Sequence, residues 1–102
     1  MPSYRLTSDA QSDLIEVRRY TLTQWGVLQS KKYLLELRQT INLLSDAPRL
    51  GKHVPDITVG VFSFSHASHI IYYVLDKHQL VVFGVLHKRM VPSNHLENRE
   101  II

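Results

Sequence analysis

The 102-residue sequence contains no cysteine. Disulfide scaffolds, thiol catalysis and cysteine-liganded zinc are therefore excluded, in agreement with a reducing compartment. Long apolar runs are missing too, because no segment approaches the roughly 20 apolar residues that a membrane span needs. The first five residues, Met-Pro-Ser-Tyr-Arg, lack the apolar region of a signal peptide. We therefore expect a cytoplasmic protein with no membrane partner.

Motifs of cofactor and metal chemistry are also missing. The four glycines are isolated from one another, so no glycine-rich phosphate loop exists, and there is no G-x-S-x-G nucleophile motif. Six histidines are present, and His66 and His69 have H-x-x-H spacing. That pair falls on a predicted turn and lacks the glutamate of H-E-x-x-H. We predict no metal site and no cofactor.

The excess of positive charge is small. Lys and Arg number 12 against 9 Asp and Glu, giving a net charge of +3 and a pI near 9.4. A pI above about 9 is typical of nucleic-acid binders. Here, however, the cations occur as separate pairs, Arg18-Arg19, Lys31-Lys32 and Lys88-Arg89, without a basic arm. Such dispersed charge favours an acidic protein partner, and we expect no direct DNA binding by the chain alone.

Helical periodicity occupies the first half of what the length predicts to be a single domain, residues 1–102. After an extended start at residues 4–6, Ser8 and Gln11 form an S-x-x-Q capping box ahead of a helix over residues 9–25. Gly26 ends that helix, and a second runs from Val27 to about Ser45. The predicted core stripes are Ala10, Leu14, Val17 and Trp25, then Val27, Leu34, Leu37, Ile41 and Leu44. The short join predicts an antiparallel helical hairpin.

The second helix carries more apolar surface than one core needs. The residues predicted to lie off its main stripe are Leu28, Tyr33, Leu35 and Leu43. Two interpretations are open: a broad core face beneath a sheet, or a groove for a partner helix or peptide.

The second half changes to a strand pattern. After a loop at residues 46–56, three β-rich runs at 58–64, 69–75 and 80–86 are separated by short turn clusters, which predicts an antiparallel meander. A shift of apolar phase near Gly60 indicates a bulge, and the nearly all-apolar last run indicates a central strand. The predicted fold is α+β, in the order β-α-α-β-β-β, with the helical hairpin packed on a mainly antiparallel twisted sheet.

His87-Lys88-Arg89-Met90 follows the predicted central strand directly. A histidine beside two cations suits RNA cleavage, where a base takes the 2′-hydroxyl proton and cations stabilise the phosphorane. The same residues suit docking on an acidic protein surface. The third interpretation is a charged strand end that faces water.

The order of the predicted elements and the sequence motifs together resemble those of the ParE toxins of bacterial type II toxin–antitoxin modules, within the wider RelE/ParE superfamily. The matching text is Y-R-L-T-S-D-A-Q-S-D-L at residues 4–14, Y-T-L-T-Q-W-G at 20–26, P-R-L-G-K at 48–52, H-I-I-Y-Y at 69–73 and V-L-H-K-R-M at 85–90. The resemblance extends over nearly the whole chain.

This resemblance implies a toxin held inactive by a cognate antitoxin, whose disordered C-terminal segment folds on the toxin. The candidate antitoxin contacts are Leu28, Tyr33 and Leu35, with the sheet face or an edge strand as the other contact. Members of the ParE branch poison DNA gyrase, so the resemblance also implies a growth-arresting gyrase inhibitor. The candidate gyrase contacts are His87, Lys88, Arg89 and Met90, together with the tail that follows.

The resemblance to the wider superfamily also leaves ribonuclease activity as the alternative to gyrase inhibition. RelE-type members cleave mRNA on the ribosome, and in that branch an Arg commonly lies beside the position held here by Phe62, which cannot pair with a phosphate. We therefore expect no catalytic residues in a gyrase inhibitor, and name His87, Arg89 and Lys88 for the alternative endoribonuclease. A third class is a non-toxic remnant that binds only the antitoxin.

Overall fold

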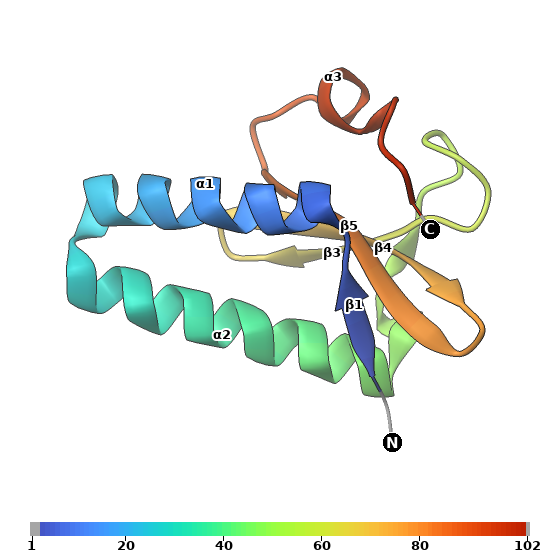
Figure 1. The fold of residues 1–102 in the computed structure, drawn as a ribbon, viewed down its shortest axis with the longest axis horizontal. Coiled ribbons are helices and arrows are strands. Elements are labelled where there is room, and N and C mark those ends of the chain that lie inside the picture. Colours follow the sequence, from blue (N-terminus) through green and yellow to red (C-terminus); the bar gives the residue numbers. More distant parts are fainter. Residues whose placement is uncertain (1–2, 102) are drawn as a thin grey trace.

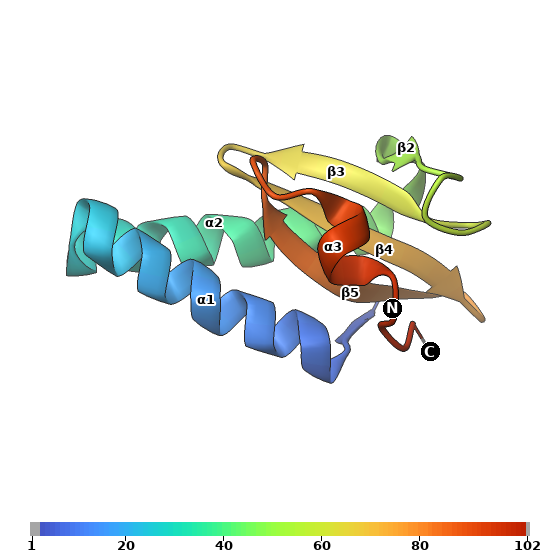
Figure 2. The same ribbon diagram turned by 90° about the horizontal axis from the view of Figure 1, so that it is seen from above.

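The protein is described by a computed structural model that covers residues 3–101, in which two long helices pack on one face of a five-stranded sheet (Figures 1 and 2). The elements are β1 (Tyr4–Leu6), α1 (Ser8–Trp25), α2 (Val27–Asp46), the 3-10 helix η1 (Pro48–Leu50), β2 (Lys52–His53), β3 (Phe62–His66), β4 (His69–Asp76), β5 (Gln79–His87) and α3 (Pro92–Leu96). Strand order is β1-β5-β4-β3-β2, with β1 parallel to β5 and the other pairs antiparallel. The predicted α+β class and helical hairpin are confirmed.

Helix α1 is capped one residue earlier than the sequence predicted. Thr7 has extended backbone angles, and its hydroxyl accepts a hydrogen bond from the Ala10 N–H at 3.1 Å. Gln11 does not close the predicted box, because its amide donates to the Leu6 carbonyl. Thr7 thus satisfies one of the amides that every helix start leaves unpaired.

The buried stripes of the two helices differ from prediction near their join. The buried residues are Ala10, Leu14, Val17 and Thr21 on α1, and Ser30, Tyr33, Leu37, Ile41 and Leu44 on α2. Trp25 and Val27, both predicted to be core, are exposed. The hydroxyls of Thr21 and Ser30 instead make a 2.6 Å hydrogen bond between the helices. Two small hydroxyl side chains therefore occupy the helix contact beside Gly26, whose φ of +87° makes the turn.

The sheet contains a strand that the sequence did not predict, and its first predicted run was misplaced. Within the predicted loop, Lys52–His53 pairs with Phe62 and Ser63, but two residues are too few for a period-2 signal. Residues 58–61 form a turn, so β3 begins at Phe62. The predictions for β4 and β5 are correct to within one residue at each end.

β5 is an interior strand with both faces covered, as predicted, but it lies between β1 and β4, and β4 is the middle strand of the five. The helix-facing core includes Leu80, Val82 and Val85, whereas Val81, Phe83 and Leu86 contact a second core under the C-terminal tail. A bulge near Gly60 was a wrong prediction. The register shift lies where Tyr72 pairs with Gly84 and Tyr73 with Val82, which leaves Phe83 as the extra residue.

The tail beyond β5 folds back over the sheet face opposite the helices (Figure 2). Leu96 of α3 is buried against this face above Gly84. A Cβ atom on residue 84 would lie 2.6 Å from Leu96 Cδ2, so a larger residue there would force the Leu96 side chain to shift. None of the helices in residues 3–101 has the length and apolar character needed to cross a membrane.

Candidate functional site

The four residues predicted to contact a target lie on one tight turn at the end of β5. The Met90 N–H donates to the His87 carbonyl at 2.9 Å, and the Lys88 N–H donates to the Ser68 carbonyl at 2.9 Å. Lys88, Arg89 and Met90 are exposed, whereas His87 is half-buried. The structure thus places three of the four side chains, including both cations, where a partner can reach them.

The ring of His87 is already engaged within this turn. The Arg89 N–H donates to His87 Nδ1 at 3.1 Å. Because a neutral imidazole has one donor and one acceptor nitrogen, the proton of the neutral ring lies on Nε2. In this state Nε2 can only donate, and the nitrogen that could act as a base is occupied by the turn.

A cluster of aromatic rings supports the turn from the helix side. The Tyr20 ring lies 5.1 Å from that of His87 and 5.9 Å from that of His69, and the two histidine rings are 5.3 Å apart. We call Tyr20, Tyr33, His66, His69 and His87 the histidine–tyrosine cluster. It joins α1, α2, β3, β4 and β5 at one end of the molecule.

Tyr33 is the buried centre of this cluster, which corrects the prediction that it lines a surface groove. Its side chain is only 5% exposed. The hydroxyl donates to the His66 carbonyl at 3.1 Å, accepts from the Ser68 N–H at 3.2 Å, and lies 2.7 Å from His69 Nδ1. All three contacts are satisfied when a neutral His69 carries its proton on Nδ1. Tyr33 therefore fixes the β3–β4 turn and cannot present its ring to a partner.

The environment of His69 keeps its ring neutral at pH 7. Burial, reinforced by the nearby charges of His87 and His66, lowers the pKa of His69 to about 4. Burial also raises the pKa of the Tyr33 hydroxyl. The histidine pair singled out as H-x-x-H is thus part of a hydrogen-bonded core. No group of three metal-ligating side chains occurs in residues 3–101.

A groove of about 490 Å³ opens beside the cluster, between α1 and the end of β5. We call it the end groove. Its lining includes Glu16, Tyr20, His69, His87, Met90 and His95. No sequence pattern predicted it, because its walls come from α1, β4, β5 and the tail. Most of its wall is aromatic or aliphatic, whereas Glu16 and Arg19 pair with each other at 2.7 Å on its rim.

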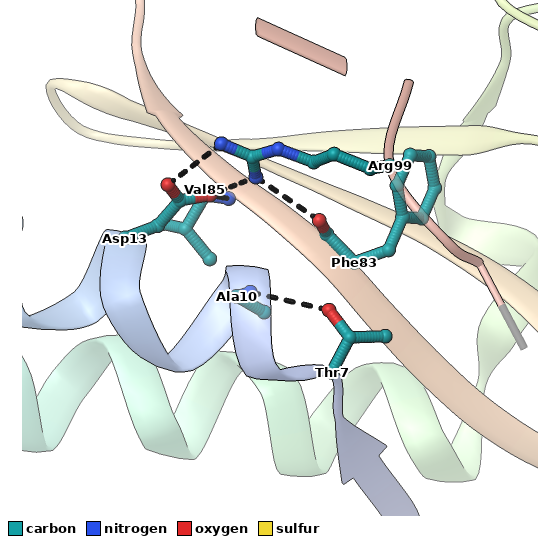
Figure 3. A network of polar contacts seen from close by, with 6 residues as sticks. All are labelled: Thr7, Ala10, Asp13, Phe83, Val85 and Arg99. Carbon is teal, nitrogen blue, oxygen red and sulfur yellow. Dashed lines mark hydrogen bonds and ion pairs between the residues drawn. The ribbon is translucent and has the colours of Figure 1, made fainter. Parts of the chain in front are cut away.

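A polar network fixes the tail to α1 and β5 (Figure 3). Asp13 on α1 pairs with Arg99 through both carboxylate oxygens, one contact measuring 3.0 Å. Asp13 Oδ2 also accepts from the Val85 N–H at 2.9 Å, and Arg99 donates to the Phe83 carbonyl at 3.1 Å. This pair was not predicted, since no local pattern connects two residues that are 86 positions apart.

A second groove, of about 470 Å³, lies along the helical hairpin. Its apolar lining is Leu6, Leu14, Ile15 and Leu34, and its polar lining is Gln11, Arg18 and Arg38. We call it the hairpin groove. Leu28 and Leu35 do not line it. They are 84% and 59% exposed, and at 100° per residue they project from the side of α2 opposite its buried stripe.

Phe62, which the resemblance placed beside the arginine position of RelE-type members, packs against rings of the neighbouring strands. Its ring stacks on that of Tyr73 at 5.6 Å and contacts the ring of His53 at 5.3 Å. Tyr73 in turn pairs with Val82, five residues before His87 along β5. Phe62 therefore supplies no charge and does not adjoin the His87 turn.

The chain matches the family described as ParE toxin of type II toxin–antitoxin system, parDE, over residues 4–92. It is 30% identical to Toxin ParE1 of Caulobacter vibrioides over 94% of this chain and 99% of that protein. It is 28% identical to Toxin ParE of Escherichia coli, with 97% of each chain covered. The fold is similar to a chain of the chromosomal ParDE system from P. aeruginosa (TM-score 0.73, 15% identity), covering 85% of this chain and 96% of that one. Together with the α+β fold, these matches show that the chain belongs to the ParE toxin family of type II toxin–antitoxin systems.

Proposed function

We propose that this ParE-family toxin arrests growth by inhibiting DNA gyrase through protein–protein contact, and that a cognate antitoxin neutralises it. The observation that carries the proposal is the exposed turn at Lys88, Arg89 and Met90, which joins two cations to an apolar side chain. Cations with an adjoining apolar group suit docking on an acidic protein surface.

The arrangement around His87 supports binding over catalysis. A nuclease needs a base aimed at the 2′-hydroxyl and a cation at the scissile phosphate. The Nδ1 atom of His87 already accepts from the Arg89 N–H, and Phe62 is packed on Tyr73. Both groups are therefore committed to the fold of the toxin itself.

The antitoxin is proposed to contact the apolar surfaces of the helical hairpin. Four apolar side chains line the hairpin groove together with the cations Arg18 and Arg38. That combination fits an amphipathic helix with acidic residues beside its apolar face. Leu28 and Leu35 give a further apolar surface on the outer side of α2, and we keep both as antitoxin contacts.

Translation-dependent mRNA cleavage is the second candidate. One observation favours it: His87, Lys88 and Arg89 lie together on a single turn, as a cationic site for RNA would require. In this alternative the His87 Nε2–H acts as a general acid, and the two cations bind the phosphate. Substitution of His87 by Ala would then abolish the cuts in ribosome-bound message.

A supercoiling assay with purified gyrase tests the proposed target surface. We expect the double variant Lys88→Ala/Arg89→Ala, and separately Met90→Ala, to lose at least tenfold in inhibitory potency. The matched control is Arg49→Ala/Lys52→Ala, which removes two exposed cations from η1 and β2. Equal potency of the two double variants would refute the assignment of the turn as the target contact.

A further inference from the structure

Residues 87–90 form the surface that the proposed function assigns to the target, and we call them the target turn. The register between β4 and β5 ends where His69 pairs with His87. Beyond that pair, Lys88 donates its N–H to the Ser68 carbonyl at 2.9 Å. Within residues 3–101 this is the only backbone hydrogen bond that joins residues 88–90 to a part of the chain outside β5. The position of the target turn therefore depends on Ser68.

Ser68 belongs to a two-residue turn between β3 and β4. His66 pairs with His69, so Ala67 and Ser68 alone connect the two strands. Two-residue hairpin loops favour turns with positive φ, because these match the twist of the strands. Ala67 accordingly has a φ of +50°, a conformation that glycine adopts readily and that is unfavourable for alanine. The turn that holds Lys88 is thus built around a strained residue.

The Tyr33 hydroxyl bonds to backbone groups on both sides of Ala67. It donates to the His66 carbonyl at 3.1 Å and accepts from the Ser68 N–H at 3.2 Å. No other side chain in residues 3–101 bonds to the backbone of residues 66–68. A strained backbone persists only where the surrounding structure holds it in place. One hydroxyl on α2 therefore holds the turn that in its own way holds Lys88.

The packing of aromatic rings joins the same two turns. His69 Nδ1 lies 2.7 Å from the Tyr33 hydroxyl, and the rings of His69 and His87 are 5.3 Å apart. These two histidines face each other at the end of the β4–β5 register. Loss of the Tyr33 hydroxyl should therefore affect the target turn by two routes, at His87 through side chains and at Lys88 through the backbone.

We infer that Tyr33 is a positioning residue for the target contact: its hydroxyl fixes the β3–β4 turn, and that turn fixes residues 88–90 in the position that meets the target. The inference rests on the proposed function, because it concerns the same target surface. Tyr33 is too deeply buried to touch a target, so it acts only through the residues that it holds. The helical hairpin thereby contributes to target binding from inside the molecule.

Amide hydrogen exchange measured by NMR tests the positioning without gyrase. Tyr33→Phe keeps the ring and removes the hydroxyl, so the Lys88 amide should exchange about tenfold faster, whereas the Val54 amide, bonded within the loop between β2 and β3, should keep its rate within about twofold. The matched control is Tyr73→Phe. It removes another buried hydroxyl, which bonds to η1, and should leave the Lys88 amide unchanged.

Three results of this measurement would overturn the inference. The first is an unchanged rate at Lys88 in Tyr33→Phe. The second is equal acceleration of the Lys88 amide in Tyr33→Phe and Tyr73→Phe. The third is equal acceleration of the Lys88 and Val54 amides in Tyr33→Phe, which would indicate a global loss of stability in place of a local release of the turn.

Gyrase inhibition gives a readout that a merely structural role would not move. Tyr33→Phe should weaken inhibition about fivefold in the wild-type background but less than about twofold when Lys88 and Arg89 are already alanine, because the hydroxyl acts through those side chains. Equal losses in both backgrounds would contradict the inference. Normal supercoiling with the wild-type toxin would refute the proposed function, and the two failures are distinguishable because the exchange measurement contains no gyrase.

A second substitution tests the role of strain at Ala67. Glycine reaches a φ of +50° without strain, so a turn with glycine at residue 67 should depend less on the Tyr33 hydroxyl. In the Tyr33→Phe background, Ala67→Gly should return the Lys88 exchange rate to within about threefold of the wild-type rate. No recovery in the double variant would contradict the route through the β3–β4 turn.

Discussion

Asp13 on the first helix and Arg99 near the end of the chain form a two-oxygen ion pair that also bonds to two backbone groups of β5. The bulge in β5 turns the Phe83 carbonyl and the Val85 N–H toward an edge without a strand, and these two side chains bond to both groups. The hydrogen bond to Asp13 raises the pKa of Arg99, so the guanidinium stays charged. One pair thereby fastens α1, β5 and the tail together.

Removal of Arg99 should destabilise the fold strongly. Arg99→Ala leaves the Asp13 carboxylate, whose side chain is only 12% exposed, without its charge partner, and we expect a loss of about 2–4 kcal/mol in the free energy of unfolding. The matched control is Arg19→Ala. It breaks the Glu16 pair, in which both side chains are more than 60% exposed, and should cost no more than about 0.5 kcal/mol. Urea denaturation measures both, and equal losses would refute a structural role for the pair.

Gly51 should resist substitution because of Tyr73. A Cβ atom on residue 51 would lie 2.8 Å from Tyr73 Cζ and closer still to the hydroxyl, which donates to the Pro48 carbonyl at 2.6 Å. Gly51→Ala should therefore cost about 1–3 kcal/mol through overpacking. In a Tyr73→Phe background the same substitution should cost less, because the closest atom is gone. A double-mutant cycle by urea denaturation checks this, and additive losses would disprove the steric explanation.

Acid should weaken the fold through His69. Its pKa is about 4 in the folded protein and near 6.5 in an unfolded chain. Between these values the unfolded chain binds a proton that the folded protein does not, so stability is full above pH 6.5 and falls as the pH decreases to 4. The contribution of this one group is on the order of 3 kcal/mol. His69→Gln should flatten the pH dependence in that window. A variant with the same slope as the wild type would show that another group is responsible.

Thr7 and Ser8 differ in their roles at the start of α1. Thr7→Ala removes the acceptor for the Ala10 N–H and should lower the free energy of unfolding by about 1 kcal/mol. Ser8 is exposed and already within the helix, so Ser8→Ala should change it by a few tenths of a kcal/mol at most. Thermal denaturation compares the two, and a larger loss for Ser8→Ala would restore the capping box predicted from sequence.

The periodicity of apolar residues in the sequence correctly predicted the long helices and the longest strands. Helical spacing located α1 and α2, and the apolar run from residue 80 to 86 identified β5 as a strand buried on both faces. Tyr33 was wrongly predicted to lie off the buried face of α2. That face includes the polar residue Ser30, which bonds to Thr21, and a pattern of apolar residues does not detect such a contact. Asp13 and Arg99 could not be paired from sequence, since tertiary folding alone brings them together. The same holds for the end groove, whose walls come from separate elements.

The most direct test of the proposed function runs two assays on one preparation of the toxin. Supercoiling by purified gyrase should fall as toxin is added and recover when the cognate antitoxin is supplied. In parallel, primer extension on ribosome-bound message should reveal no toxin-dependent cuts. Normal supercoiling at saturating toxin, together with cuts that His87→Ala abolishes, would contradict the proposal and establish the endoribonuclease instead.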